Sequence, residues 1–484
     1  MRIVLKTLAL AAVPALMLSA CSTPSSGIGT TAGNLPAQAS YAAHPNADKA
    51  TDLHAGGATF PAYAYNEGYQ PVGTGTQPNQ IGPGPGSLFA SAGTKGTIYY
   101  CLTGTGFGKS IFDGATASEA TAPCAALTDS PTGFGSRYAV PDFVGADQAL
   151  KNSEYEAYQT NREPSTGENY GEPFQFPAIG GAIVYGYRKE DLPGHKEIKF
   201  STWTYCAIAN GTITDWNDPA ITADNGGSVT GGVSEPMTFY FRSDSSGTSY
   251  LFTTHLQATC GSSWPAPYNA SPYQGGTHGG GTSAAWTYGA STTWPGPGSH
   301  SVPNSNFIGE SGNPGVIAGI QSKAHSVGYV EGAWATVAGS PAVGQAWLQN
   351  TSGNFEDPTV HANVVTALST LTGASISFGT ASDTDAPFAG DTEPMCQMYI
   401  NPSHFTSPKE ASAYPIVGVS YLIFYGKNQG VHTADKIKLI KYVISKAGGQ
   451  AMENLDYTPL SYDIYHHVSE AVDGTKPYKS PCIQ

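Results

Sequence analysis

Residues 241–252 read Phe-Arg-Ser-Asp-Ser-Ser-Gly-Thr-Ser-Tyr-Leu-Phe, a Ser/Gly/Thr loop with one Arg and one Asp between two apolar segments. Residues 237–241 are rich in aromatic side chains, which favours a short strand, and the apolar run at 250–256 is compatible with a helix. A strand, a Ser/Gly turn and a helix start together are typical of an anion-binding site. Free backbone N–H groups and the positive end of the helix dipole face such a turn.

The side chains of this loop suit the same role. Arg242 can supply a charged, two-pronged clamp, and Ser246 and Thr248 can add hydroxyl donors. Asp244 is expected to orient Arg242. The plain alternative is an ordinary helix N-cap beside a solvent-exposed arginine, since Ser/Gly loops commonly cap helices.

Two more stretches have the same strand–turn–helix pattern. Residues 53–61 run into a Gly-Gly-Ala-Thr turn that carries Thr59, and Pro61 suits a first helical turn because its missing N–H would be unpaired there anyway. Residues 97–111 form a strand, a Gly/Thr turn and a helix start. This turn fits neither the Walker A pattern nor a dinucleotide fingerprint.

Two long apolar runs, 174–187 and 414–425, read as strands. The first is interrupted by Gly180-Gly181 and suits a strand that passes between two lobes. Apolar residues at helical spacing predict a helix over 434–447. Stretches at about 66–92, 113–140 and 262–306 read as long, irregular insertions.

The charge balance restricts the partners. The chain has 484 residues, enough for two or three domains, and a formal net charge of -14. Nucleic acid is excluded as a partner, because its phosphate backbone is held by a surplus of Lys and Arg. Any anion must be held by local dipoles and a few cations against the overall negative field.

The N-terminus predicts export. The apolar run at 8–18 is shorter than the ~20 residues needed to cross a bilayer. It ends at Leu-Ser-Ala before Cys21, which resembles a bacterial lipoprotein signal. We therefore expect a signal peptide at 1–20, a lipid anchor on Cys21 and a flexible tether at 21–50. An ordinary secretory signal is the alternative.

Six cysteines remain, and an even number outside the cytoplasm favours disulfides. Pairing by sequence neighbour gives three bonds, although six cysteines allow 15 connectivities. No Cys-x-x-Cys pair occurs, so no zinc site, other metal or cofactor is expected. The three candidate disulfides are Cys101–Cys124, Cys206–Cys260 and Cys396–Cys482.

Taken together, the motifs resemble one known family, the PstS-like phosphate-binding lipoproteins of phosphate ABC transporters. The resemblance extends from Ala55 to about Ala471, with the motifs in the family's order. The similar stretches are 55–61, 174–177 with Gly180-Gly181, 242–249, 328–331 and 455–460.

The resemblance implies an α/β, two-lobe periplasmic-binding-protein fold of type II, with hinge strands and a ligand cleft between the lobes. One lobe would comprise 51–182 with 416–484, and the other 183–415. The protein would be an extracytoplasmic, membrane-anchored monomer that binds inorganic phosphate and delivers it to the permease subunits of an ABC importer.

The family's ligand positions can be carried over residue by residue. The second loop departs from the family pattern, because Gly104 stands where a Ser is usual; we expect Thr105, rather than Thr103, to supply the hydroxyl. The implied phosphate-binding residues are Thr59, Phe60, Thr105, Asp147, Arg242, Ser246, Gly247 and Thr248.

Asp147 would determine ligand choice. An ionised carboxylate accepts hydrogen bonds and donates none, so it can bind an oxyanion that still carries a proton, such as hydrogen phosphate. It repels sulfate, which has no proton at neutral pH. The alternative for Asp147 is a solvated loop acid.

Three other functions compete. A secreted phosphatase or other hydrolase is one, although the sequence has no Gly-x-Ser-x-Gly elbow and no His-Glu-x-x-His pair. A surface interaction or adhesion protein on a binding-protein scaffold is another, suggested by the Tyr/Trp-rich insertions. A binder of another oxyanion, such as sulfate, is the third. The phosphate-binding interpretation predicts no catalytic residues.

Overall fold

The computed structural model describes residues 51–66, 80–81, 84, 86–115, 140–162, 170–192, 197–270, 272–273, 284–379, 396–427 and 430–484. The predicted signal peptide, the tether, Cys21 and Cys124 lie outside these residues, as do large parts of the stretches 66–92 and 113–140.

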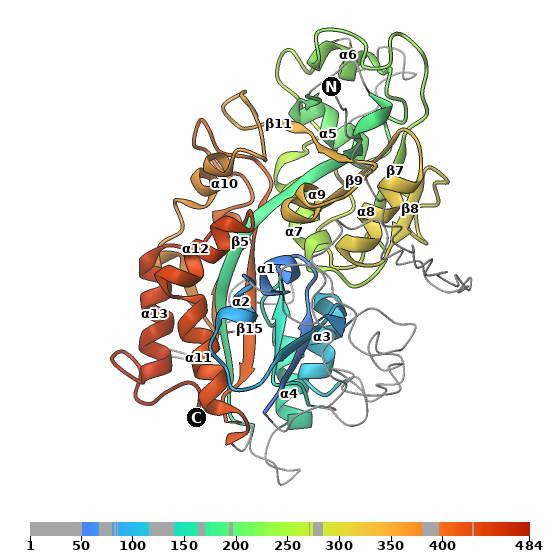
Figure 1. Cartoon of the computed structure of the whole chain (residues 1–484). Helices are drawn as coiled ribbons and strands as arrows, with labels where there is room; N and C mark the ends of the chain where they lie inside the picture. The colour runs from blue at the N-terminus through green and yellow to red at the C-terminus, as the bar shows by residue number, and fades with distance from the viewer. Residues whose placement is uncertain are drawn as a thin grey trace, which may run out of the picture.

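One mixed sheet of ten described strands runs through both halves of the molecule (Figure 1). Its order is β2-β3-β1-β4-β15-β5-β9-β7-β8, and β10 also pairs with β5. The strands are β1 (Leu53–Gly57), β2 (Gln80–Ile81), β3 (Ile98–Cys101), β4 (Phe143–Ala146), β5 (Pro173–Arg188), β7 (Thr238–Arg242), β8 (Phe307–Glu310), β9 (Ser326–Glu331), β10 (Val343–Gln345) and β15 (Val417–Tyr425).

Two smaller sheets accompany it. They contain β6 (Lys199–Phe200), β11 (Trp347–Gln349) and β12 (Phe355–Glu356), and β13 (Ile376–Phe378) with β14 (Met398–Ile400).

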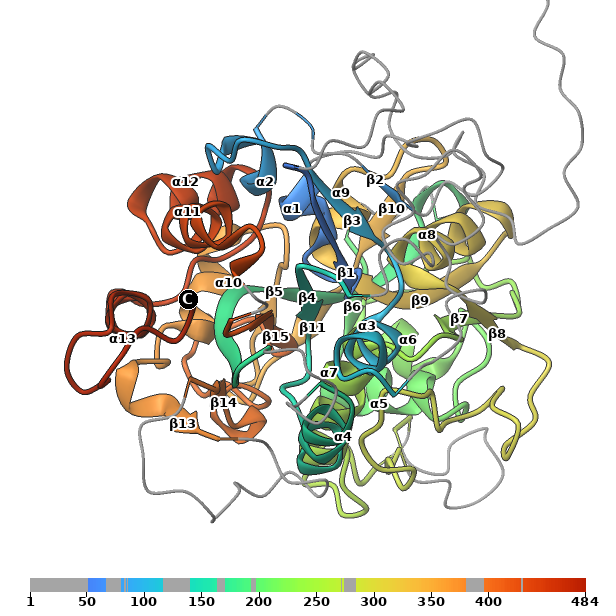
Figure 2. The same cartoon turned by 90° about the horizontal axis from the view of Figure 1, so that it is seen from below.

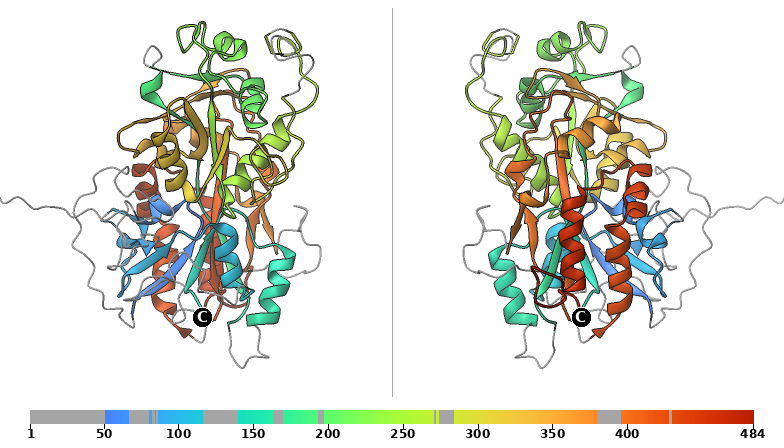
Figure 3. Two further views of the ribbon diagram at one scale, coloured as in Figure 1. Left: turned by 90° about the vertical axis from the view of Figure 1, so that its right-hand side faces the viewer. Right: turned by 90° about the vertical axis from the view of Figure 1, so that its left-hand side faces the viewer.

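Helices cover both faces of the main sheet. In the half of the molecule that is drawn lower in Figure 1, α3 and α4 lie on one side of the sheet and α11, α12 and α13 on the other, as Figures 2 and 3 also show. The helices are α1 (Ala62–Asn66), α2 (Leu88–Ser91), α3 (Thr105–Phe112), α4 (Asn152–Arg162), α5 (Thr202–Ala209), α6 (Pro219–Asp224), α7 (Gly247–Thr259), α8 (Gly312–Ser322), α9 (Gly332–Thr336), α10 (His361–Leu368), α11 (Thr433–Val443), α12 (Lys446–Asn454) and α13 (Tyr462–Asp473).

Strand β5 connects the two halves. Its first part pairs with β15 and its second part, from Ile183, pairs with β9. The predicted strand between two lobes is therefore confirmed. A side chain at Gly181 would lie 3.0 Å from the Phe60 ring and 3.3 Å from Tyr457, so glycine admits these two aromatic residues at the crossing. The residue bounds of the lobes stay a prediction.

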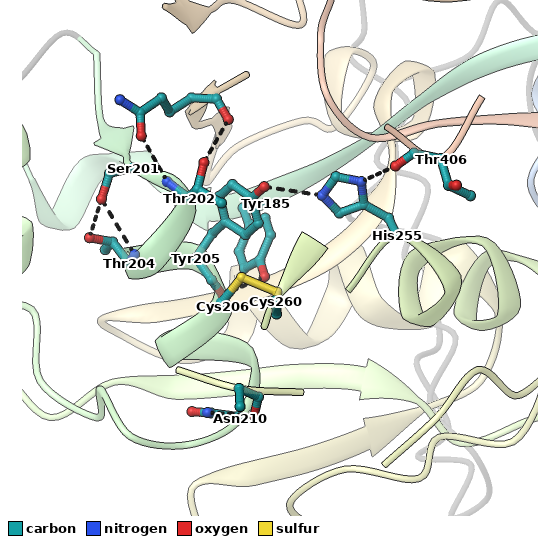
Figure 4. The surroundings of a disulfide bond; sticks show 12 residues. Tyr185, Ser201, Thr202, Thr204, Tyr205, Cys206, Asn210, His255, Cys260 and Thr406 are labelled. Atoms are coloured by element: carbon teal, nitrogen blue, oxygen red, sulfur yellow. Dashed lines mark hydrogen bonds between the residues drawn. A yellow bond between two sulfur atoms is a disulfide. The ribbon is translucent and has the colours of Figure 1, made fainter. Parts of the chain in front are cut away.

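Two of the three predicted disulfides are confirmed, Cys206–Cys260 and Cys396–Cys482. The first joins α5 to the end of α7 (Figure 4). Beside it, His255 is buried between the Tyr205 hydroxyl and the Thr406 carbonyl. Cys101 is also disulfide-bonded, and its predicted partner Cys124 lies outside the described residues.

The described parts of the stretch 262–306 contain no helix or strand, as the composition predicted. This insertion nevertheless packs against the core. Trp294 is buried and stacks on Phe241 at 5.5 Å and on Tyr329 at 5.4 Å between ring centroids. Trp294 therefore packs against β7 directly before the Arg242 loop.

The single helix predicted over 434–447 is wrong at its end. The structure has two helices, α11 and α12, in its place. Ser445 starts the second one, because its hydroxyl accepts a hydrogen bond from the Gly448 N–H at 3.0 Å. The N-cap at Ser445 therefore divides a segment whose hydrophobic spacing predicted one continuous helix.

Candidate anion-binding site

Segments from both halves meet where β5 crosses between them. Thr59 follows β1, Thr105 begins α3 and Asp147 follows β4, while Arg242 ends β7 and the loop after it leads into α7. All eight predicted phosphate-binding residues are buried. They are Thr59, Phe60, Thr105, Asp147, Arg242, Ser246, Gly247 and Thr248.

Gly247 shows how closely the halves approach. A Cβ atom at this position would lie 2.4 Å from Thr105 Oγ1 and 2.5 Å from Asp147 Cβ. Real side chains do not make such contacts, so glycine is required for the N-terminus of α7 to reach the loops of the other half. The cleft in this structure is closed.

The departure in the second loop has a steric reason. A Cβ at Gly104 would lie 2.6 Å from Asp244 Oδ2, and one at Gly106 would lie 1.9 Å from Ser245 Oγ. The Gly106 N–H donates to the Ser245 carbonyl at 3.0 Å. The glycines let this loop contact the Arg242 loop directly, at a position where a larger residue would collide with it.

Arg242 is held rigidly. Its Nε and Nη2 donate to the two oxygens of Asp244 at 2.7 and 2.5 Å, which confirms that Asp244 orients it. Its Nη1 donates to Thr248 Oγ1 at 3.2 Å. Burial lowers the pKa of Arg242, but the Asp244 carboxylate outweighs burial and leaves that pKa above its ordinary value. The alternative of a solvent-exposed arginine is wrong, since Arg242 is 1% exposed.

Three threonine hydroxyls are oriented by bonds that they accept. Thr59 Oγ1 accepts the backbone N–H of Asn313 at 3.1 Å and its side-chain amide at 3.2 Å. Thr105 Oγ1 accepts the Asp147 N–H at 3.2 Å, and Thr248 Oγ1 accepts from Arg242. A hydroxyl carries one hydrogen besides its acceptor positions, so Thr59 and Thr248 can still donate into the cleft. The Thr105 hydroxyl also lies beside the Asp147 carboxylate, where its hydrogen bond lowers the pKa of Asp147.

Thr103 behaves differently. Its hydroxyl donates to the Gly104 carbonyl at 3.2 Å, which uses its hydrogen locally. This contrast agrees with the choice of Thr105 over Thr103 as the second hydroxyl.

Asp147 supplies the acceptor. Its Oδ1 accepts the Ser420 hydroxyl at 2.7 Å, while its buried Oδ2 has no hydrogen-bond partner among the described residues. Burial raises the pKa of Asp147 to about 7, although Ser420 and Arg242 act in the opposite direction. The side chain is 1% exposed, so the alternative of a solvated loop acid is wrong.

The sequence reasoning missed two residues of this site. Asn313 lies in the first turn of α8, where its amide contacts Thr59 and reaches Thr248 at 3.5 Å. The available signal was a Ser-Gly pair at 311–312 directly before the apolar stretch that forms α8. Ser420 lies within β15, and a lone serine in that strand's apolar sequence was its signal.

The geometry fits a small oxyanion. Helices α3, α7 and α8 all begin here, so their free N–H groups and dipoles favour negative charge. Hydroxyl donors, one arginine neutralised by Asp244 and one carboxylate acceptor complete the set. Among the described residues, no group of three His, Cys, Asp or Glu side chains could hold a metal ion.

The comparison with known families agrees with this geometry. A sequence profile described as the PBP superfamily domain matches residues 43–447. The chain belongs to the PBP superfamily. The two-lobe fold and the PstS-like resemblance expected from the motifs are thereby confirmed.

This member of the PBP superfamily has several curated relatives. It is 29% identical over 310 residues to the phosphate-binding protein PstS of Methanocaldococcus jannaschii, covering 62% of this chain and 66% of the relative. It is 27% identical over 334 residues to the phosphate-binding protein PstS 2 of Mycobacterium tuberculosis, covering 69% and 74%. It is also 25% identical over 325 residues to alkaline phosphatase L of Pseudomonas aeruginosa, covering 67% of each.

Solved structures show the same fold. A phosphate-binding protein from Stenotrophomonas maltophilia superposes with a TM-score of 0.57 at 19% identity, covering 87% of this chain and 94% of the other. The periplasmic phosphate-binding protein PfluDING, bound with phosphate, gives 0.56 at 20% identity, covering 87% and 93%.

Proposed function

We propose that this protein captures inorganic phosphate in the closed cleft and delivers it to an ABC-type phosphate importer. The observation that carries the proposal is the buried Asp147 carboxylate, whose Oδ2 has no described partner, in a site otherwise built of donors. Relatives named as phosphate-binding proteins support it.

The charges of the site suit reversible capture. Asp244 neutralises most of the charge of Arg242, so neutral hydroxyl and backbone donors carry much of the binding. A strongly cationic site would retain the anion. In its ionised form, above its pKa of about 7, Asp147 selects an oxyanion that brings a proton, which hydrogen phosphate does and sulfate does not.

The direct test is equilibrium dialysis of the purified, ligand-stripped protein against radiolabelled phosphate. We expect one phosphate per chain, displaced by unlabelled phosphate. No retained phosphate in a folded protein would contradict the proposal and favour the surface interaction or adhesion protein.

The anchor and the partners belong to the same proposal. Cys21 would carry the lipid, placing a monomeric protein outside the cytoplasm beside the permease subunits. Among the described residues no helix has the length and apolarity to cross a membrane. Replacing Cys21 by Ser should release the protein from the membrane fraction, and retention there would contradict the anchor.

A phosphatase is the second candidate, because one relative is named alkaline phosphatase L. A phosphatase of this kind would need a nucleophile, and Ser246 is the candidate in the loop. Its hydroxyl oxygen instead caps α7 by accepting the Ser249 N–H at 3.1 Å. We expect no hydrolysis of a chromogenic phosphate ester. Turnover that is lost with Ser246→Ala would favour the enzyme.

A further inference from the structure

Behind the anion site, a buried hydrogen-bonded cluster joins the two halves. Glu331 ends β9 and caps α9 by accepting the N–H groups of Ala333 and Trp334. The Tyr457 hydroxyl, from the loop after α12, lies 2.9 Å from Glu331 Oε2 and 2.7 Å from the Phe60 carbonyl. Glu331, Tyr457 and Phe60 are each fully buried.

Counting hydrogens shows that this cluster needs an extra proton. Two O···O contacts of hydrogen-bond length require two hydrogens, one in each contact. The Phe60 carbonyl has none, and the Tyr457 hydroxyl has one. With an ionised Glu331, one contact would bring two oxygens together with no hydrogen between them. A protonated Glu331 donates to Tyr457, which then donates to Phe60.

We propose that Glu331 is a positioning residue that holds a proton in the closed cleft, and that this proton ties α9 to the anion-binding loop at Thr59 and Phe60. The inference rests on the proposed function, since it concerns closure over the anion. A second bond supports the tie, because Trp334 Nε1 donates to the Thr59 carbonyl at 2.8 Å.

The surroundings of Glu331 favour the neutral acid. Burial raises its pKa from 4.5 to about 8, and Asp456 acts in the same direction, while the hydrogen bonds from Ala333, Tyr457 and Trp334 oppose them. The groups that act on Tyr457 are Glu331, Tyr63 and Asp147. None of these described groups is a cation that would stabilise an ionised Glu331.

The direction of the pH effect follows from this. On this proposal, opening separates Glu331 from Tyr457 and admits water, so the pKa of Glu331 falls toward its ordinary value. Closure therefore takes up a proton between the ordinary pKa and about 8. Protonation of Glu331 therefore strengthens phosphate binding most at low pH. The affinity decreases by at most about tenfold per pH unit through this window, and it levels off above it.

The test compares the wild-type protein with Glu331→Gln. A glutamine amide donates to Tyr457 without titrating, and its oxygen still accepts the Ala333 N–H. The Trp334 N–H loses its acceptor in this variant, a cost that does not change with pH and so leaves the pH dependence of the comparison intact. Phosphate is titrated calorimetrically from pH 6 to 9, in two buffers of different ionisation enthalpy. The wild-type to variant affinity ratio cancels the ionisation of phosphate and Asp147. Glu453→Gln, an exposed acid on α12, is the matched control.

We expect the affinity ratio to fall between pH 6 and 8 and to level off near pH 9, with greater proton uptake by wild type than by Glu331→Gln. Glu453→Gln should match wild type throughout. If Glu331→Gln fails to fold, Glu331→Met, which removes the titrating carboxyl and keeps the length of the side chain, should lose the same pH dependence.

Equal proton uptake and a constant affinity ratio would overturn the inference while leaving phosphate binding intact. Absence of phosphate binding in wild type would overturn the proposed function and this inference with it.

Discussion

At the scale of single residues, the site is defined by which atoms donate and which accept. Thr59 and Thr248 accept bonds from the protein and keep a hydrogen for the ligand, while Thr105 accepts the Asp147 N–H and lies beside its carboxylate. Asp147 is the carboxylate acceptor among them. Selectivity should therefore depend on the carboxylate and affinity on the donors.

Asp147→Asn should weaken the discrimination against sulfate, because an amide can donate to an unprotonated oxyanion. The measurement is competition between sulfate and phosphate in calorimetric titrations. Complete rejection of sulfate by this variant would show that Asp147 does not determine the choice.

Arg242→Ala should weaken phosphate binding by about 2–5 kcal/mol, the usual cost of removing one partner of a buried charge pair. The control is Arg188→Ala, which removes a partly exposed arginine paired with Glu190 and Asp191. Equal affinities for the two variants would contradict the clamp.

Asn313→Asp should weaken phosphate binding by about 1–3 kcal/mol, since a carboxylate would draw the hydrogens of Thr59 and Thr248 away from the ligand. Asn354→Asp, at an exposed amide, is the control. Unchanged affinity in Asn313→Asp would mean that the amide does not orient these hydroxyls.

Local pattern decided which residues could be predicted. Thr59, Arg242 and Thr248 lie in strand–turn–helix stretches that are visible in the sequence. Asn313 contacts Thr59 across 254 residues, and Ser420 contacts Asp147 across 273, so no local spacing indicates either contact.

At the scale of elements, the helix starts form the site. The sequence predicted the strands and turns before α1, α3 and α7 because each combines an apolar run with a Gly-containing turn. It did not predict that α11 ends before Ser445, since a cap competes with hydrophobic spacing. Nor could it show that the insertion at 262–306 supports the Arg242 loop.

Gly247→Ala should prevent full closure, because the new methyl group would overlap Thr105 and Asp147. We expect phosphate affinity to fall at least tenfold while the melting temperature of the ligand-free protein changes little. Gly261→Ala, just beyond the other end of α7, has no atom within 4 Å of the new Cβ and is the control. Identical affinities would contradict a cleft closed by contact at Gly247.

At the scale of the whole molecule, two long strands and the disulfides Cys206–Cys260 and Cys396–Cys482 hold distant segments together. The Cys396–Cys482 bond closes a loop of sequence separation 86 and fixes the C-terminus beside β14. Replacing both cysteines by Ser should lower the free energy of unfolding by about 2–4 kcal/mol. Denaturant unfolding measures this, and an unchanged midpoint would show that the bond adds no stability.

The two-lobe organisation was predicted from the family resemblance, and the apolar run that forms β5 agreed with it as a strand between two lobes. The closed arrangement was not, because it depends on contacts such as Gly106 to Ser245 and Glu331 to Tyr457 between segments far apart in sequence.

The most direct test of phosphate capture by the cleft is a calorimetric titration of the ligand-stripped protein, first with phosphate and then with sulfate, at pH 8.5, where Asp147, with its pKa of about 7, is ionised. Tight binding of one phosphate without measurable sulfate binding is the result predicted by a buried carboxylate acceptor among hydroxyl donors. Sulfate binding as tight as phosphate binding would contradict the role of Asp147, and binding of neither anion would contradict an anion-capture function for the cleft.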